Sequence, residues 1–184
     1  MSFWQFLFVT IVGGVYLFLP AYVANMTPVG ASSLARRLGI PNPPIWEARL
    51  GKNKTWIGTA AGFVAAIVIA GIQAELARVS IFEQLRPETV NEHPWFRLGL
   101  LMAIGALVVG DMGKSYMKRR FGIKPGAPWK PWDDLDYGMG TALVLSPLAW
   151  TQPLMLVVGV LIAYALNPVV NRISHRAGIK LVPH

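Results

Sequence analysis

The amino-acid sequence predicts an all-α integral membrane protein, a bundle of about five transmembrane helices that forms a single membrane domain over residues 1–184. Hydrophobic residues make up 54% of the chain and charged residues only 14%, which excludes an ordinary soluble domain. Long uncharged runs alternate with short charged segments, as in multi-pass membrane proteins. The chain has no cysteine, which excludes disulfides, thiolate metal sites and thiol nucleophiles.

The first three helices follow from apolar runs. The N-terminal run up to Met26 lacks the basic start and the cleavage site of a signal peptide, so it predicts a helix that the protein retains. Residues 55–74 are uncharged and long enough for about 30 Å of helix. The third helix runs from about Trp95 towards Met117 and carries Asp111 near its inner end. An aspartate at that depth requires a polar cavity.

The last two helices come from one long run. Residues 137–171 are uncharged, and a single helix of that length would reach about 52 Å. Pro147 and Pro153 interrupt the run, and proline disrupts a helix interior. The pattern therefore favours two short helices joined near Gln152.

The charges of the connecting segments predict the orientation. Segments 25–54, 111–136 and the tail after 171 carry five, six and three basic residues, whereas 75–97 carries three basic and four acidic residues. The positive-inside rule therefore places the N-terminus and segment 75–97 outside, and the C-terminus and the other segments in the cytoplasm. We expect a multi-pass protein of the cell membrane with an odd number of spans.

The stretch from Gly110 to Gly140 is the candidate reaction site. It holds four of the nine acidic residues and six of the seventeen basic ones, between two apolar runs. Carboxylates beside basic residues can hold a divalent metal ion against phosphates. The expected substrates are therefore a phosphorylated lipid and a nucleotide. The three histidines have no metal-ligand spacing.

The acids of this stretch are candidate metal ligands. Asp111 precedes Ser115 and Lys118 by four and seven residues, so a continuous helix would carry all three on one face; pairing of the aspartate with the lysine is the alternative interpretation. Asp133 and Asp136 lie three apart at an expected helix start, where acids are favourable in any case. Asp133, Asp134 and Asp136 lie so close together beside lipid that they favour a cation among them.

A second anion site is predicted before the helix at 55–74. The stretch GKNKTW, residues 51–56, lacks the first glycine and the preceding strand of a phosphate-binding loop, which excludes a nucleotide triphosphatase of that class. Lys54 and Thr55 would still bind an anion through the free N–H groups of a helix start. A plain helix cap with a surface lysine explains the same residues equally well.

Four stretches together resemble the CDP-archaeol synthase family: LPAYVANMTPV (19–29), GKNKTWIG (51–58), GDMGKSYMKRRFGIKPG (110–126) and DDLDYGMG (133–140). The resemblance implies five transmembrane helices, magnesium as cofactor, and transfer of a cytidylyl group from CTP to a lipid glycerol phosphate of the 2,3-bis-O-geranylgeranylglycerol phosphate type. Pyrophosphate is the other product. The family is distantly related to the CDP-diacylglycerol synthases.

Carried over residue by residue, the resemblance implies metal ligands at Asp111, Asp133 and Asp136. Lys118 and Arg119 are the implied catalytic cations. The implied substrate contacts come from two segments, about 25–54 and 111–136, and are Asn25, Lys54, Thr55, Ser115, Arg120 and Lys124. The chain departs from the family pattern at Ile57, where arginine is common, and at Asp134, where glutamine is usual. The first departure removes one possible phosphate contact.

Two other functions stay open. One is activity like that of a CDP-diacylglycerol synthase on phosphatidate, because apolar helices accept isoprenoid or acyl chains equally. The other is a small non-catalytic membrane module. A phosphotransferase that displaces CMP is disfavoured, because its D-G-x-x-A-R signature is absent. The expected partners are CTP, the lipid glycerol phosphate and membrane lipids, without nucleic acid; the oligomeric state is left open.

Overall fold

The computed structural model describes residues 2–124 and 127–176, and over these residues the chain is helical with no named strand. The elements in order are α1 (Phe3–Arg37), α2 (Glu47–Leu50), α3 (Trp56–Leu76), α4 (Ser80–Glu83), α5 (Glu88–Asn91), α6 (Trp95–Ala103), the π-helix η1 (Ile104–Met112), α7 (Gly113–Arg120), α8 (Trp132–Leu145) and α9 (Pro153–Arg176). The all-α membrane fold is thus confirmed.

Over the described residues, four helical segments are long and apolar enough to cross a membrane: α1, α3, α9 and the continuous segment α6–η1–α7. The fifth expected helix, α8, has only fourteen residues. That is about 21 Å, shorter than a hydrocarbon core of about 30 Å. The predicted break near Gln152 is confirmed, because residues 146–152 separate α8 from α9.

The first helix is longer than the sequence pattern indicated. Residues 25–54 were expected to form a loop, but α1 continues to Arg37 and reaches 35 residues, about 52 Å. Two prolines inside it, Pro20 and Pro28, do not end it. The connection starts only at Leu38 and Gly39, where the glycine has φ of 67°, a conformation that favours glycine. Residues 111–120 are likewise helical rather than a loop.

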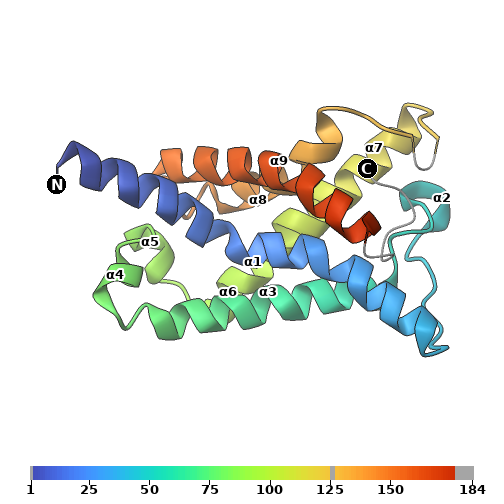
Figure 1. The fold of residues 1–184 in the computed structure, drawn as a ribbon, viewed down its shortest axis with the longest axis horizontal. Helices are drawn as coiled ribbons and strands as arrows, with labels where there is room; N and C mark the ends of the chain where they lie inside the picture. The colour runs from blue at the N-terminus through green and yellow to red at the C-terminus, as the bar shows by residue number, and fades with distance from the viewer. Residues whose placement is uncertain (1, 125–126, 177–184) are drawn as a thin grey trace.

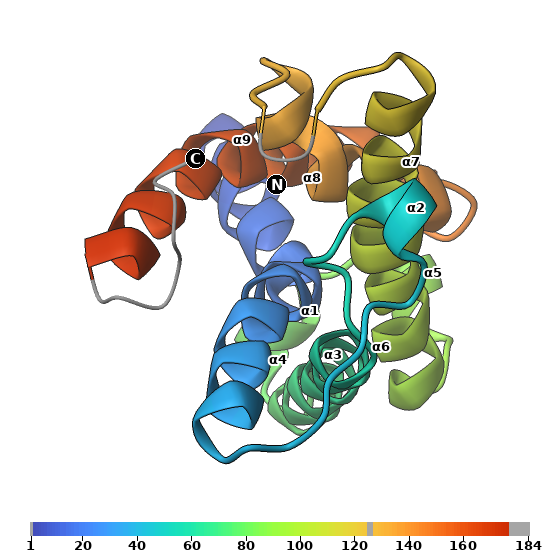
Figure 2. The ribbon, with the colours of Figure 1, turned by 90° about the vertical axis from the view of Figure 1, so that its right-hand side faces the viewer.

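The connecting segments gather at the two ends of an elongated bundle (Figure 1). The N-terminus lies at the same end as α4 and α5, whereas α2, α7 and the end of α9 lie at the other. Figure 2 views this second end, with α2 beside α7; the Arg49 guanidinium stacks over the Tyr116 ring at 5.9 Å there. The basic segments therefore share one end, and its assignment to the cytoplasm stays a prediction.

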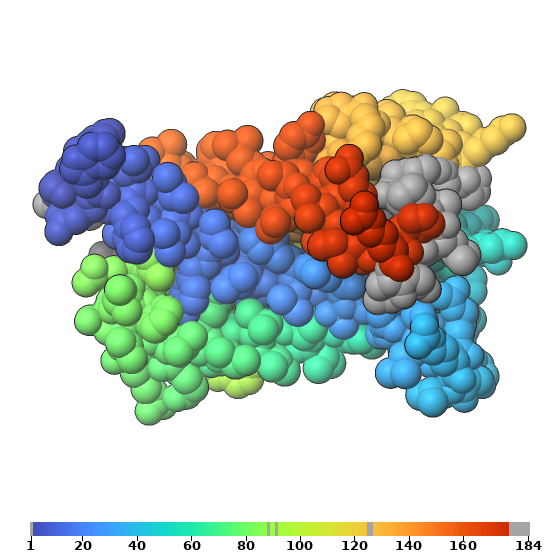
Figure 3. All heavy atoms as spheres, viewed as in Figure 1, coloured from blue at the N-terminus to red at the C-terminus, as the bar shows by residue number. Residues whose placement is uncertain are grey.

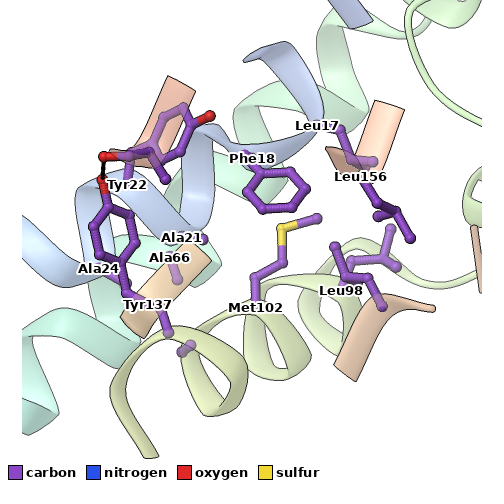
Figure 4. Packing of buried hydrophobic residues seen from close by; sticks show 14 of the residues in the cluster. Leu17, Phe18, Ala21, Tyr22, Ala24, Ala66, Leu98, Met102, Tyr137 and Leu156 are labelled. Carbon is purple, nitrogen blue, oxygen red and sulfur yellow. Dashed lines mark hydrogen bonds between the residues drawn. The ribbon is translucent and has the colours of Figure 1, made fainter. Parts of the chain in front are cut away.

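The core lies where α1 meets α6, α8 and α9. Figure 4 shows the Phe18 ring beside the Met102 side chain, and both are fully buried. The Tyr22 hydroxyl donates to the Gly159 carbonyl at 2.9 Å and the Tyr137 hydroxyl to the Ala163 carbonyl at 3.0 Å, so α1 and α8 are both bonded to α9. Apolar side chains of α3 and α9 are exposed, and both helices reach the molecular surface in Figure 3. Such a surface suits lipid.

The backbones of η1 and α8 touch at glycines. A Cβ added at Gly110 would lie 2.5 Å from the Asp136 carbonyl oxygen, and one added at Gly140 would lie 2.3 Å from the Gly105 carbonyl oxygen. No side chain fits at either position. This contact brings Asp111, the residue after Gly110, next to the first turns of α8.

Gly140→Ala is expected to destabilise the protein by at least about 2 kcal/mol, because the new methyl group must push η1 and α8 apart. Gly30→Ala is the matched control in a helix, since a Cβ there meets no atom within 4 Å; it should be neutral or slightly stabilising. Thermal unfolding of the detergent-solubilised variants measures both effects. Equal unfolding temperatures for the two variants would contradict the tight contact.

The predicted orientation in the membrane can be tested with single introduced cysteines, because the wild-type chain has no cysteine. Gln84→Cys and Lys52→Cys place thiols at exposed positions at opposite ends of the bundle. A membrane-impermeant maleimide added to intact cells should label position 84 and not 52, because the basic segment 25–54 stays inside. Permeabilised cells should label both. Labelling of position 52 alone in intact cells would reverse the topology.

Candidate active site

Six charged side chains meet at the end of the bundle that carries α2 and α7. We call them the charged cluster: Asp111, Asp133, Asp136, Lys54, Lys114 and Lys118. Asp111 comes from η1, and Asp133 and Asp136 come from the start of α8. Lys114 and Lys118 come from α7, and Lys54 comes from the segment just before α3. Three carboxylates thus face three ammonium groups, and the cluster is electrically balanced when all six are ionised.

Lys114 lies at the centre of the charged cluster. Its Nζ is 2.5 Å from Asp136 Oδ2, 3.3 Å from Asp133 Oδ1 and 3.8 Å from Asp111 Oδ1. Its side chain is only 16% exposed, so these pairs are far less screened than surface ion pairs. Asp136 is buried further, at 4%. One cation therefore binds three carboxylates from two helical segments.

The other two lysines each bind one carboxylate of the charged cluster. Lys54 pairs with Asp111 across 57 residues of sequence. Lys118 Nζ lies 2.9 and 3.1 Å from the two Asp133 oxygens, and it also donates to the Ala127 carbonyl at 2.6 Å. These contacts tie the segment after α7 to the start of α8.

Asp133 is held in its ionised form. Burial alone would raise the pKa of its carboxyl group, but hydrogen bonds from Lys118 and from the Trp129 N–H, together with the positive charges of Lys114 and Lys118, outweigh burial and leave the pKa below its ordinary value. Asp133 is therefore a charged carboxylate at neutral pH, as a metal ligand has to be.

Asp111 belongs to the π-helix η1. The residue lies in the last turn of η1, and its carbonyl accepts a hydrogen bond from Ser115 Oγ at 2.8 Å. Widened π turns are frequent at functional sites. The alternative interpretation of the sequence, in which Asp111 pairs with Lys118, is wrong. Asp111 pairs with Lys54 and Lys114, and Lys118 pairs with Asp133.

Six of the expected substrate or catalytic residues lie outside the charged cluster, and one of them, Ser115, donates to the Asp111 carbonyl. Thr55 Oγ1 bonds to Ser32 Oγ at 2.9 Å and to Asn42 Nδ2 at 3.0 Å, so its side chain holds the chain before α3. The remaining four are Asn25, which is half-buried in α1, Arg119, and the exposed Arg120 and Lys124. None of these four has a hydrogen bond or ion pair to the charged cluster within the described parts of the chain.

Arg119 has unused donor capacity. One terminal nitrogen donates to the Ile123 carbonyl, while its Nε is buried and has no hydrogen-bond partner among the described residues. A buried donor without a partner is unfavourable. A guanidinium with a free N–H is suited to a phosphate oxygen.

Lys114 was not among the residues that the sequence singled out. The signal was present, because Lys114 follows Asp111 by three residues and precedes Lys118 by four, so a helix carries all three on one face. The resemblance implied roles for Ser115, Lys118 and Arg119 in this stretch and none for Lys114. Its partners Asp133 and Asp136 lie 19 and 22 residues further along the chain, so no local sequence pattern predicts these contacts.

The acids fit a divalent cation by charge and ligand type. Carboxylate oxygens are the ligands that Mg²⁺ prefers, and Asp111, Asp133 and Asp136 already surround a positive charge. As they stand, no group of three acidic or histidine side chains in the described ranges is arranged to hold a metal ion directly. The position that the three carboxylates share is taken by the Lys114 ammonium.

The two positions that depart from the family pattern make their contacts with residues outside the charged cluster. Asp134 is buried; it pairs with Lys130 and accepts from Asn167 Nδ2 at 3.3 Å, so it faces α9. Ile57 is half-buried, and its N–H donates to Asn42 Oδ1 at 3.0 Å. Asp134 thus serves the contact between α8 and α9.

Comparison with known proteins agrees with the pattern of motifs. The family described as "CarS-like: CDP-archaeol synthase" matches residues 6–184. A CDP-archaeol synthase of Aeropyrum pernix is 33% identical over 94% of this chain and 92% of its own length, and one of Halobacterium salinarum is 33% identical over 95% and 97%. One of Thermofilum pendens is 34% identical over 90% of this chain and 77% of its own length.

No solved structure matches. The family match covers nearly the whole chain, and the relatives match the chain over most of its length at above 30% identity. The residues that the family matches include every residue of the charged cluster. The chain therefore belongs to the CDP-archaeol synthase family.

Proposed function

We propose that this protein is a membrane cytidylyltransferase. It transfers the cytidylyl group of CTP to a lipid glycerol phosphate of the 2,3-bis-O-geranylgeranylglycerol phosphate type and forms a CDP-activated lipid and pyrophosphate. Family membership supports the reaction class. The observation that carries the proposal is the charged cluster itself, three carboxylates around one cation at the end of an apolar bundle.

In the proposed reaction, an oxygen of the lipid phosphate attacks the α-phosphorus of CTP. One P–O bond forms to the lipid phosphate, and the bond between the α-phosphorus and the bridging oxygen breaks, releasing pyrophosphate. The attacking phosphate is already ionised at neutral pH, so no strong general base is needed. Positioning and charge neutralisation then supply the rate enhancement.

The charged cluster would perform both tasks. Asp111 and Asp133, supported by Asp136, would hold a divalent cation, magnesium in this proposal, which when bound neutralises phosphoryl charge and orients the triphosphate. Lys118 would act on the charge of the transferring phosphoryl group. Arg119 offers its unpaired Nε to a phosphate oxygen.

The remaining proposed substrate contacts surround the charged cluster. Lys54 enters from the segment before α3, which Thr55 stabilises through its hydrogen bonds. Ser115 would contact the substrate from α7, where its hydroxyl donates to the Asp111 carbonyl. Arg120 and Lys124 are exposed at the end of α7 and would bind the outer phosphates and the leaving pyrophosphate. Asn25 would contact the substrate from α1. We place the protein in the cell membrane, with this end in the cytoplasm where CTP is available.

A transfer assay tests the function. Purified protein in detergent with magnesium and α-³²P-labelled CTP should move label into the organic phase when given an isoprenoid ether glycerol phosphate. Phosphatidate in a parallel reaction tests the diacyl alternative, and a metal chelator should stop transfer completely. Folded protein that labels neither lipid would exclude a cytidylyltransferase and favour a non-catalytic membrane module.

A further inference from the structure

We propose that Lys114 is an internal substitute for the divalent cation: its ammonium holds Asp111, Asp133 and Asp136 together until a metal ion binds, and it must then withdraw. The inference rests on the proposed function, because the divalent cation is part of that function. It assigns a positioning role to a residue that was not among the catalytic or substrate-binding residues expected from the sequence.

The contacts of Lys114 carry this inference. Lys54 and Lys118 each pair with one carboxylate of the charged cluster, but Lys114 lies within 4 Å of all three. Three carboxylates crowded at the start of α8 and the end of η1 repel one another unless a cation separates them. Lys114 is therefore the residue that stabilises their close approach.

The same geometry prevents Lys114 and a metal ion from sharing the position. A Mg²⁺ ion needs carboxylate oxygens at about 2.0–2.1 Å, and the ammonium already lies 2.5 Å from Asp136 and 3.3 Å from Asp133. An ammonium and a divalent ion within a few ångströms of each other repel strongly in this half-buried site. Lys114 therefore swings out on its flexible stem, and its charge becomes available to the phosphates of the nucleotide.

The test measures binding of Mg²⁺ alone, without CTP or lipid, by isothermal titration calorimetry of the purified protein in detergent. Lys114→Gln should raise Mg²⁺ affinity by roughly tenfold or more, because binding no longer has to displace a charge. Lys114→Arg, which keeps the charge, should bind Mg²⁺ no more tightly than wild type. Lys130→Gln is the matched control: it neutralises a lysine that pairs with Asp134 outside the charged cluster and should change affinity by less than about twofold.

Thermal unfolding gives a second readout. In chelator, Lys114→Gln should unfold at a lower temperature than wild type, because three carboxylates then face each other without their central cation. Saturating Mg²⁺ should remove this difference. Lys114→Met serves as a second neutral variant, and both are expected to recover their fold with Mg²⁺.

Three outcomes would overturn the inference: unchanged or weaker Mg²⁺ affinity in Lys114→Gln, tighter binding in Lys114→Arg, or neutral variants that stay unfolded in saturating Mg²⁺. Failure of the function is separable, because these measurements contain no CTP. Tighter Mg²⁺ binding without any CDP-lipid product would reject the transferase and keep the role of Lys114.

Discussion

Asp133→Asn is expected to abolish formation of CDP-lipid while the protein still folds. The substitution removes the charge that a divalent cation needs and changes the side-chain volume little. Asp133 accepts hydrogen bonds from Lys118 and from the Trp129 N–H, and an amide oxygen can still accept part of these. Transfer from labelled CTP, with thermal unfolding as the check on folding, measures the effect. Asp111→Asn should be equally inactive.

Asp134→Asn is the matched control for this experiment. Asp134 neighbours Asp133 in sequence but is buried against α9, where it pairs with Lys130 and accepts from Asn167. We expect activity close to that of wild type, with a small loss of stability because the ion pair is lost. Inactive Asp134→Asn beside active Asp133→Asn would mean that the metal ligand had been assigned one residue away from its true position.

Lys118→Ala should lower the turnover number by roughly 30-fold to 10³-fold, because a cation acting on developing phosphoryl charge in a half-buried site contributes about 2–4 kcal/mol. Its side chain is only 9% exposed, so screening by solvent cannot explain a loss of that size. Lys118→Arg should recover part of the activity by keeping the charge. Initial rates at varied CTP concentration separate turnover from KM.

Lys52→Ala provides the comparison for Lys118. Lys52 lies two residues before Lys54, but its side chain is 82% exposed and pairs with Glu47 only at 3.5 Å. A surface pair of this kind is worth little, and turnover should stay near the wild-type value. If Lys118→Ala changed KM for CTP and left turnover intact, Lys118 would bind the nucleotide without acting in the transition state.

Much of the fold could be predicted from the chain because membrane helices are local features. Runs of apolar residues and the interrupting Pro147 and Pro153 locate the helices and the break near Gln152, since a helix in lipid has to satisfy its own backbone. The ends of helices were less predictable. α1 passes Met26 and continues to Arg37, because tertiary packing on α3 stabilises residues that a hydropathy pattern assigns to a loop.

The candidate site was predictable in its acids and less so in its cations. Asp111, Asp133 and Asp136 stand out because carboxylates are rare and unfavourable beside lipid. Lys118 was expected on the face of Asp111 but pairs with Asp133. Asp133 lies 15 residues further along the chain, at the start of α8, so no local pattern predicts this pair.

By itself, the sequence determined the membrane class, the helical runs, the basic segments at one end and the acids that mark the site, because hydropathy and charge act locally along the chain. Only the tertiary structure decided that Lys114 lies at the centre of three carboxylates and that Asp134 turns towards α9. The physical reason is the glycine contact between η1 and α8. It brings Lys114 close to carboxylates that lie 19 and 22 residues further along the chain, and no local pattern encodes that distance.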